Sequence, residues 1–574
     1  MIVPRTDRAL SVQKEIEQDN PGATIMPIII SSDKTQVTLF RNKAAYPVYI
    51  TIGNLPKDIR SKPSQGGQVL LAYLPTTKLE HIKNKAARRR TQANLFHACL
   101  RMILKPLCNA GVQGLPMTSG DGLTRRVHPV FSVYVGDYPE QVLVTCVKSG
   151  DCPICLSPRD ALGDLDQEHP MRDINDVLDA LATVETSTTA EYTKACQDVG
   201  IKPVYKPFWE QLPYSNVYLA IAPDILHQLL QGVIKHLVSW VKEAYSEDEI
   251  DARCRRLPPN HNVRLFFKGL MTLSRLTGRE HSDICRILLG LVIDMRLPGG
   301  MSPTRLVRAV RALLDFVYLA QYPVHSKATL DALDDALRRF HENKEIFVDL
   351  GIREHFHFPK LHFARHYRYL IELLGAADNF NTEYTERLHI DLAKEAYRAT
   401  NRKDEYVQMT LWLERKEKIL RHDRYIKWCQ TGRPALQTIN ELHQYTISHI
   451  FMTREPSAKA MPFGRLATEY GVENFAKRLA EFAVRHTHPE LSSAQVRDSA
   501  DLLRLEFDRV AVYHKAKFWE STFARYRHAS DDYDVIHAKP ARHDKRGRTV
   551  PGQFDTALVN FDGSGRSVGV RGTY

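Results

Sequence analysis

Three short apolar runs near the N-terminus constrain the fold of this chain more than any other feature of its sequence. They are "ATIMPIIISSDKT" (23–35), "YPVYITIGN" (46–54) and "GQVLLAYLP" (67–75). Runs of this length and composition predict β-strands, and their close spacing predicts a meander. We therefore expect the chain to begin with a sheet.

Helical patterns dominate the remainder of the sequence. A long one starts at Lys78, strand character returns in "HPVFSVYVGD" (128–137), and residues from about 156 to 350 carry clear apolar stripes. Further helices are expected over 360–425 and 436–530, while the basic, Gly-rich end is either a tail or the start of a β element. This combination of strands and helices predicts the α/β class.

The composition suits a soluble globular protein in a reducing compartment. Of the 574 residues, 43% are apolar and 25% are charged, and no run approaches the ~20 apolar residues of a membrane span. The N-terminus lacks the apolar core of a secretory signal. Nine cysteines are too sparse for a disulfide scaffold. A net charge of +12 and a pI of about 9.1 favour polyanionic partners.

Two aspartates stand where predicted strands end. Asp33 closes the first apolar run, and Asp137 closes the strand at 128–137. If these strands are neighbours in one sheet, both carboxylates emerge at the same edge and can hold Mg²⁺. A third carboxylate on a packed helix would complete a two-metal site for in-line displacement at phosphorus. For either aspartate alone, the turn preference of this residue type is the simpler explanation.

Two cysteines and two histidines have the spacing of zinc ligands. Cys152-Pro-Ile-Cys155 is a C-x₂-C half-site, and His362 and His366 lie four residues apart on a predicted helix, so both point to one side. A metalloprotease motif would need Glu after the first histidine, where Phe363 stands. Spacing alone leaves open a structural Cys₂His₂ zinc, a redox-active cysteine pair and four residues that never meet.

Two glutamates follow the histidine pair. A zinc ion that joins helix 360–370 to the loop after Asp137 would carry Glu383 and Glu386 towards the two aspartates. One of these glutamates could then ligate the catalytic metal. The simpler alternative for Glu386 is an exposed helix residue beside Arg387.

Several long motifs occur in an order shared with one known family. They are "GNLPKDIRSKPSQGGQVLLAYLPTTKLEHI", "RRRTQANLFHACL", "SGDGLTRRVHPVFSVYVGDYPEQVLVT", "CPIC" with "PRDALG", "PDILHQLLQGVIKHLVSW", and "PKLHFARHY" with "NTEYTERLHIDLAKEAYRATNRKDEYVQM". Together they resemble the Plavaka transposases, which belong to the CACTA-like group of cut-and-paste transposons found in fungi. The similarity is dense from about 23 to 430 and looser beyond.

The resemblance implies an RNase H-like catalytic core, interrupted by a large all-helical insertion between the second aspartate and the glutamate. By motif, Asp33, Asp137 and Glu386 resemble the acids of a DDE triad, and Glu383 is the alternative third acid. The catalytic cofactor would be Mg²⁺ or Mn²⁺. In "PDILH", an N-cap for the following helix is the whole role expected of Asp224, and His227 either approaches the active site or packs in the core.

A structural zinc ion is the second cofactor that the resemblance implies. The cysteine pair after the second aspartate and the histidine pair before the glutamate are similar to the zinc-binding insertion of the V(D)J recombinase. The ligands would be Cys152, Cys155, His362 and His366.

The resemblance also implies a domain organisation. It consists of an N-terminal tail (1–22), the first part of the catalytic core (23–155), the helical insertion (156–350), the rest of the core with the histidine pair and third acid (351–430), a helical region (431–535) and a basic tail that resembles an incomplete β element (536–574).

The expected activity is metal-dependent cleavage and strand transfer of transposon DNA in the nucleus. The candidate partners are DNA, as transposon ends and target, and a second copy of the chain. Basic residues near the second acid, namely Arg125, Arg126 and Lys148, would meet DNA phosphates. One alternative is a domesticated or decayed transposase that binds DNA without catalysis. Another is a helical interaction protein that holds no metal.

Overall fold

The computed structural model describes most of the chain. The described residues are 7–38, 43–118, 124–258, 260, 263–264, 266–271, 273, 276–432, 449–453, 455–519, 533–543, 547–550 and 552–554. Contacts divide the chain into two compact units. Unit 1 comprises Met1–Cys254, Lys268–Gln444 and His528–Ser530, and unit 2 comprises Arg255–Phe267, Tyr445–Arg527 and Asp531–Tyr574.

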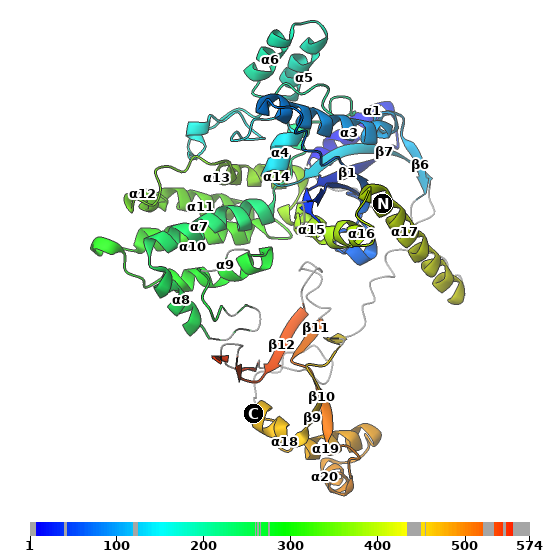
Figure 1. Cartoon of the computed structure of the whole chain (residues 1–574), viewed down its shortest axis with the longest axis vertical. Helices are drawn as coiled ribbons and strands as arrows, with labels where there is room; N and C mark the ends of the chain where they lie inside the picture. Colours follow the sequence, from blue (N-terminus) through cyan, green and yellow to red (C-terminus); the bar gives the residue numbers. More distant parts are fainter. Residues whose placement is uncertain are drawn as a thin grey trace. The chain divides into compact units, whose positions relative to one another are not determined.

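A mixed five-stranded sheet organises unit 1 (Figure 1). The strand order is β5-β4-β1-β7-β6, with bounds β1 (Thr24–Ser32), β4 (Pro47–Ile52), β5 (Val69–Tyr73), β6 (Leu115–Thr118) and β7 (Thr124–Val135). β1, β4 and β5 form the antiparallel meander that the sequence predicts, and β7 lies parallel to β1 on its other side. β1 is buried along nearly its whole length, which explains its continuous apolar run.

Helices cover both faces of this sheet. α1 (Asp7–Asp19) packs against a cluster on one face that includes Val130 of β7. The next residue, Phe131, points to the opposite face because side chains alternate along a strand. α3 (Lys85–Gln113) covers that face with its buried residues Ala93, Phe96, His97, Leu100 and Leu104. The first 22 residues, expected as a tail, therefore contain a helix of the core.

A short segment inside the expected helical insertion joins the sheet. Tyr134 and Ile221 form a parallel bridge beside the carboxyl end of β7. The Tyr134 amide donates to Ala220 O at 2.7 Å, and the Ala222 amide donates to Tyr134 O at 3.2 Å. Residues 156–350 are thus not helical throughout. A pairing of this length leaves no run of alternating residues, so sequence patterns cannot reveal it.

Helices make up the remainder of unit 1. From residue 174 to 349 they are α5 (Ile174–Ala182), α6 (Thr189–Asp198), the π-helix η6 (Ile225–Ile234), α7 (Lys235–Ala244), α8 (Glu247–Arg256, which extends into unit 2), α9 (Gly278–Val292), α10 (Thr304–Ala320), α11 (Lys327–Asn343) and α12 (Ile346–Asp349). They continue with α13 (Pro359–Phe363), η8 (Ala364–His366), α14 (Tyr367–Leu374), η9 (Ala377–Phe380), α15 (Glu383–His389), η10 (Ile390–Lys394), α16 (Glu395–Arg398) and α17 (Glu405–Gln430). Shorter elements are β2 (Thr35–Gln36), β3 (Ala44–Ala45), α2 (Lys57–Arg60) and α4 (Tyr138–Val144). No helix within the described ranges is long and apolar enough to cross a bilayer.

Unit 2 contains strands where the sequence predicts only helices. Between 431 and 535 the helices α18 (Phe463–Tyr470), α19 (Phe475–Thr487) and α20 (Ser493–Leu502) are present, but so are β8 (His449–Met452), β9 (Ala458–Pro462), β10 (Arg509–Val512) and β11 (Lys515–Trp519). β11 belongs to a sheet of order β15-β12-β11-β8 with β12 (Tyr533–Lys539) and β15 (Gln553–Phe554). The expected basic tail thus contributes strands, and its last part, 555–574, lies outside the described residues. Apolar runs of four or five residues do not distinguish strand from helix, which explains the difference.

Candidate active site and metal centre

Asp33 and Asp137 lie side by side at one edge of the sheet. Asp33 directly follows β1, and Asp137 follows β7 by two residues. The parallel pairing of Ser31 with Val135 brings the two strand ends together. The Asp137 carboxylate also caps α4, where it accepts a hydrogen bond from a first-turn amide at 3.0 Å. The two carboxylates therefore emerge from neighbouring strands.

Glu386 approaches the same edge from α15. Its Oε1 lies 2.9 Å from Nε2 of His227. Burial, followed by repulsion from Asp137 and Glu386, raises the pKa of Asp33 to about 6, while His227 acts in the opposite direction. Burial also raises the pKa of Asp137. Asp33 is thus close enough to each of the other two carboxylates for their charges to interact.

Glu383, the alternative third acid, faces a different neighbour. It accepts a hydrogen bond from Asn381 Nδ2 at 3.3 Å. Its Oε1 lies only 2.5 Å from where a Cβ on Gly278 of α9 would stand. Glu383 therefore points to the α9 side, and Glu386 is the glutamate whose charge interacts with Asp33.

The buried Asp224 and the partly buried His227 form a link to Glu386. Asp224 is the N-cap of η6 and accepts hydrogen bonds from the amides of Leu226 and His227, both at 3.1 Å. His227 Nδ1 lies 3.0 Å from Asp224 Oδ2, while its Nε2 faces Glu386. Burial disfavours the imidazolium, but the hydrogen bonds to the two carboxylates outweigh it and raise the pKa of His227 to about 11. Of the two roles considered for His227, the structure shows the approach to the acids.

Three further residues around the acids were not anticipated from the sequence. Lys360 donates to His227 O at 2.8 Å and interacts electrostatically with Asp137. His389 Nδ1 lies 3.9 Å from Asp33 Oδ2. Glu140 is buried, which raises its pKa to about 8, and it accepts a hydrogen bond from Tyr46 at 2.6 Å. Glu140 and His389 each stand three residues after a predicted acid, which is the one signal that the sequence offers for them.

Cys152, Cys155, His362 and His366 form a second cluster, although 207 residues separate Cys155 from His362. All four are buried, and one potential ligand atom from each lies within 4.8 Å of all the others. Cys152 Sγ lies 3.4 Å from His366 Nε2, and Cys155 Sγ lies 3.2 Å from His362 Nε2. Two sulfurs and two imidazole nitrogens at this separation fit the donor set of a tetrahedral zinc ion.

The backbone around the cysteines is braced independently of any ion. Cys155 forms a bridge with Met171, and the Arg172 amide donates to Ile154 O at 3.0 Å. The buried Arg172 guanidinium donates to Cys152 O at 3.0 Å. The histidines come from α13 and η8, which continue directly into α14. The cluster thus connects the loop after α4 to the helices that precede Glu386.

Comparison with known families identifies the first part of the chain. Residues 5–241 match the family described as Plavaka transposase. This part of the chain belongs to the Plavaka transposase family. No curated protein matches the chain.

The Plavaka match includes the five-stranded sheet with Asp33 and Asp137, as well as Cys152 and Cys155. His362, His366 and Glu386 lie beyond it. A transposase family implies a DNA-cleaving class of enzyme, a DNA partner and a divalent metal.

Two of the basic residues expected near the second acid, Arg125 and Arg126, lie far from it. Arg125 and Arg126 lie at the start of β7, whereas Asp137 follows its end. At ~3.3 Å per residue, the strand carries Arg126 about 30 Å from Val135 at its carboxyl end, and Asp137 lies two residues beyond. The two arginines are close to Asp137 in sequence, but they are far from it in space because the intervening residues form an extended strand. Lys360, which comes from α13, interacts electrostatically with Asp137.

Proposed function

We propose that this chain is the catalytic region of a CACTA-like DNA transposase, with Asp33, Asp137 and Glu386 as a DDE triad. One observation carries the proposal. Asp33 and Asp137 follow neighbouring parallel strands at their carboxyl ends, and the Asp33 carboxyl interacts electrostatically with both Asp137 and Glu386. Packing does not require such a group of like charges, since repulsion and burial both disfavour it.

The sheet supports an RNase H-like core for this activity. Its features are an antiparallel meander, a fourth strand parallel to the first, and a parallel bridge at residue 221 beside that strand. In this proposal the core is formed by 23–155 and 351–430, together with the bridge segment. The helices between 156 and 350 then form the insertion between the second acid and Glu386.

The acids suit a hard divalent cation. Carboxylate oxygens are the ligands that Mg²⁺ and Mn²⁺ prefer, and Asp33, Asp137 and Glu386 would hold the ions. When bound, such ions lower the pKa of water and stabilise charge on the oxygens at phosphorus. The Asp33 and Glu386 side chains remain 36% and 39% exposed, which leaves them accessible to a DNA phosphate. Asp224 and His227 orient Glu386, and Lys360 supplies positive charge beside Asp137.

The cysteine–histidine cluster would hold a structural zinc ion. With two thiolates and two imidazoles it offers four ligands, which leaves no coordination position for a substrate. Its role in the proposal is to fix α13 and η8 against the loop after α4, so that α15 presents Glu386 to the aspartates. Because its substrate would be chromosomal DNA, we place the protein in the nucleus.

A nicking assay with matched glutamate variants tests this function. Purified full-length protein, DNA with the ends of its own element, and Mg²⁺ or Mn²⁺ are combined. Glu386→Gln should lower nicking about 1,000-fold or more, because loss of a metal ligand removes several kcal/mol of transition-state stabilisation. Glu383→Gln should retain activity, because Glu383 faces α9. Equal cleavage by wild type and Glu386→Gln would overturn the assignment.

DNA binding, measured in parallel, separates catalysis from recognition. Affinity should fall steeply as salt rises, because phosphate neutralisation releases counterions. Glu386→Gln should bind as wild type does, since it removes a metal ligand and no phosphate contact. The His227 contact occupies one oxygen of Glu386 and favours a second candidate, a transposase-derived DNA-binding protein without catalytic activity. Salt-dependent binding by a wild type that never nicks would support that candidate.

A further inference from the structure

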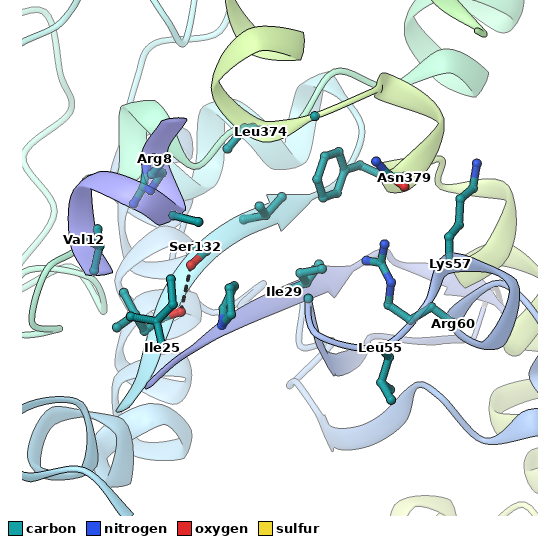
Figure 2. A pocket seen from close by; sticks show the side chains of 17 residues that line it. Arg8, Val12, Ile25, Ile29, Leu55, Lys57, Arg60, Ser132, Leu374 and Asn379 are labelled. Atoms are coloured by element: carbon teal, nitrogen blue, oxygen red, sulfur yellow. Dashed lines mark hydrogen bonds between the residues drawn. The ribbon is translucent and has the colours of Figure 1, made fainter. Parts of the chain in front are cut away.

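A cavity of about 290 Å³ lies beneath the first helix of unit 1, on the sheet face opposite α3 (Figure 2). α1, the end of α14 and η9 enclose it against β1 and β7. Its apolar lining includes Val12, Ile25, Ile29, Val130, Leu374 and Phe380. Its volume is roughly twice that of an engineered ~150 Å³ cavity that binds benzene, so a bicyclic aromatic body fits. None of the proposed catalytic acids lines it.

Positive charge stands at both ends of this cavity. Figure 2 shows Arg8 on α1 at one end and Lys57 and Arg60 at the other. Arg8 is only 7% exposed; its Nη1 donates to Asn216 O at 3.1 Å, while its Nη2 is buried without a partner. Arg60 Nε is likewise buried without a partner. Buried donors of this kind are costly unless something accepts their hydrogen bonds.

The charges around the cavity do not cancel. Lys57 forms an ion pair with Asp378. Within the part of the chain that the structure describes, neither Arg8 nor Arg60 has a carboxylate partner. Burial lowers the pKa of each guanidinium to about 10, so both remain charged at neutral pH. An apolar cavity with two unpaired cations favours an anion with an apolar body.

We propose that this cavity is a binding site for a small organic anion that carries one acidic group on an aromatic or aliphatic body. The acidic group would accept hydrogen bonds from Arg8 or Arg60, and the body would cover Ile25, Ile29 and Val130. A smaller cavity of about 20 Å³ shares Lys57 and Arg60 and continues to Thr385, beside Glu386. An occupant of the main cavity would therefore contact the segment that leads into α15.

Two dyes that differ by one acidic group provide the test. Full-length protein is titrated with 8-anilinonaphthalene-1-sulfonate and with its neutral analogue N-phenyl-1-naphthylamine, and fluorescence reports binding. One sulfonate should bind per chain, at least about tenfold more tightly than the neutral dye, because a hydrogen bond to a charged group is worth that much. Equal affinities for the two dyes would overturn the proposal.

Arginine variants locate the site. Arg8→Gln and Arg60→Gln should each weaken sulfonate binding about tenfold, Arg60→Lys should weaken it less, and Arg89→Gln on the exposed face of α3 should have no effect. The sulfonate should also raise the thermal midpoint of the wild type, since a ligand of the native state stabilises it. A lowered midpoint, or folded Arg8 and Arg60 variants that bind as wild type does, would assign the dye to non-native protein or to another surface, and the proposal would fail.

Discussion

The two clusters of unit 1 are built in opposite ways. In the cysteine–histidine cluster all four side chains are buried, and loop backbone and Arg172 brace the cysteines. In the carboxylate cluster Asp33 and Glu386 keep more than a third of their side-chain surface exposed, and His227 is the imidazole that holds Glu386. Structural zinc sites are closed, whereas catalytic metal sites keep a position open for substrate. The contrast agrees with the proposal, in which one cluster would serve folding and the other chemistry.

This contrast has a consequence for stability. In the proposal, a zinc ion joins the four buried side chains of the cysteine–histidine cluster and so stabilises the folded state of unit 1. Partly exposed acids that repel one another cost stability, and a bound cation relieves that cost. Disruption of the first cluster should therefore destabilise the protein, and neutralisation of the second should stabilise it.

Loss of zinc should have the largest effect. Structural zinc contributes on the order of 10 kcal/mol of apparent binding free energy in small zinc domains, and that energy is coupled to folding. Cys152→Ser should lower the zinc content from about one ion per chain to none and lower the thermal midpoint sharply. Elemental analysis and thermal unfolding measure the two quantities on the same sample.

Cys108→Ser is the matched control for this prediction. Cys108 is a partly buried cysteine of α3 outside the cluster. This variant should keep both its zinc and its thermal midpoint. A full zinc content in folded Cys152→Ser would show that these four residues do not form the zinc site. The cysteine–histidine cluster would then no longer be a structural metal site.

A third group distinguishes a zinc site from an ordinary buried histidine. His97 Nε2 lies 2.9 Å from Leu143 O and 3.5 Å from Cys146 Sγ, while the Phe208 amide donates to Nδ1 at 3.4 Å. Both ring nitrogens already have backbone partners, so this imidazole–thiol pair needs no ion. Burial lowers the pKa of His97 from the ordinary 6.5 to about 4.

The depressed pKa of His97 predicts acid sensitivity of intermediate size. The unfolded state binds a proton near pH 6.5 and the folded state only near pH 4, so the stabilisation is complete above pH 6.5 and is lost as pH falls through 4. The total is about 3 kcal/mol, at ~1.4 kcal/mol per pKa unit. Urea unfolding between pH 7.5 and 4.5 should show a shallower pH dependence for His97→Asn than for wild type. The exposed His81→Gln should keep the wild-type slope, and a His97→Asn slope equal to it would refute this account.

The sequence revealed those parts of the site that local patterns encode. Asp33 and Asp137 could be predicted because each follows an apolar run, and a strand end is a local property. The cysteine and histidine pairs were found because two ligands on one turn need a fixed spacing. That both pairs meet was only a hypothesis, since no pattern spans the 207 residues from Cys155 to His362.

Contacts between distant elements could not be predicted. The approach of Lys360 to His227, 133 residues earlier in the chain, depends on how α13 packs against η6. The bridge at Ile221 consists of one residue pair and has no periodicity. The short strands of unit 2 were not predicted for a related reason. Tertiary pairing, and not local preference, determines whether a segment of four residues forms a strand. Site residues that follow a local pattern could thus be predicted from the sequence, whereas the packing that brings them together could not.

Substitution of Asp33 should have the smallest effect on stability. It should stabilise the protein, whereas loss of the zinc ligand Cys152 should destabilise it. Folding raises the pKa of Asp33 from 3.8 to about 6, so ionised Asp33 is disfavoured in the folded state. The cost is absent below pH 3.8, grows as pH rises and is complete above 6. Asp33→Asn removes it and should raise the unfolding free energy at pH 8 by about 1 kcal/mol, after allowance for solvent screening of a partly exposed group.

Divalent cations and pH together make the Asp33 prediction specific. With a chelator present, the gain of Asp33→Asn over wild type should be seen at pH 8 and vanish near pH 3, below the pKa of 3.8 of the unfolded state, where the wild-type carboxyl is protonated in both states. Added Mg²⁺ should stabilise the wild type and not the variant, so the gain at pH 8 should shrink. Ser132→Ala, which changes an uncharged residue of β7 and no titratable group, should show neither the pH dependence nor the Mg²⁺ dependence. If Asp33→Asn instead destabilised the protein equally at both pH values, Asp33 would be a structural residue. The proposed difference between the carboxylate cluster and the cysteine–histidine cluster would then be wrong.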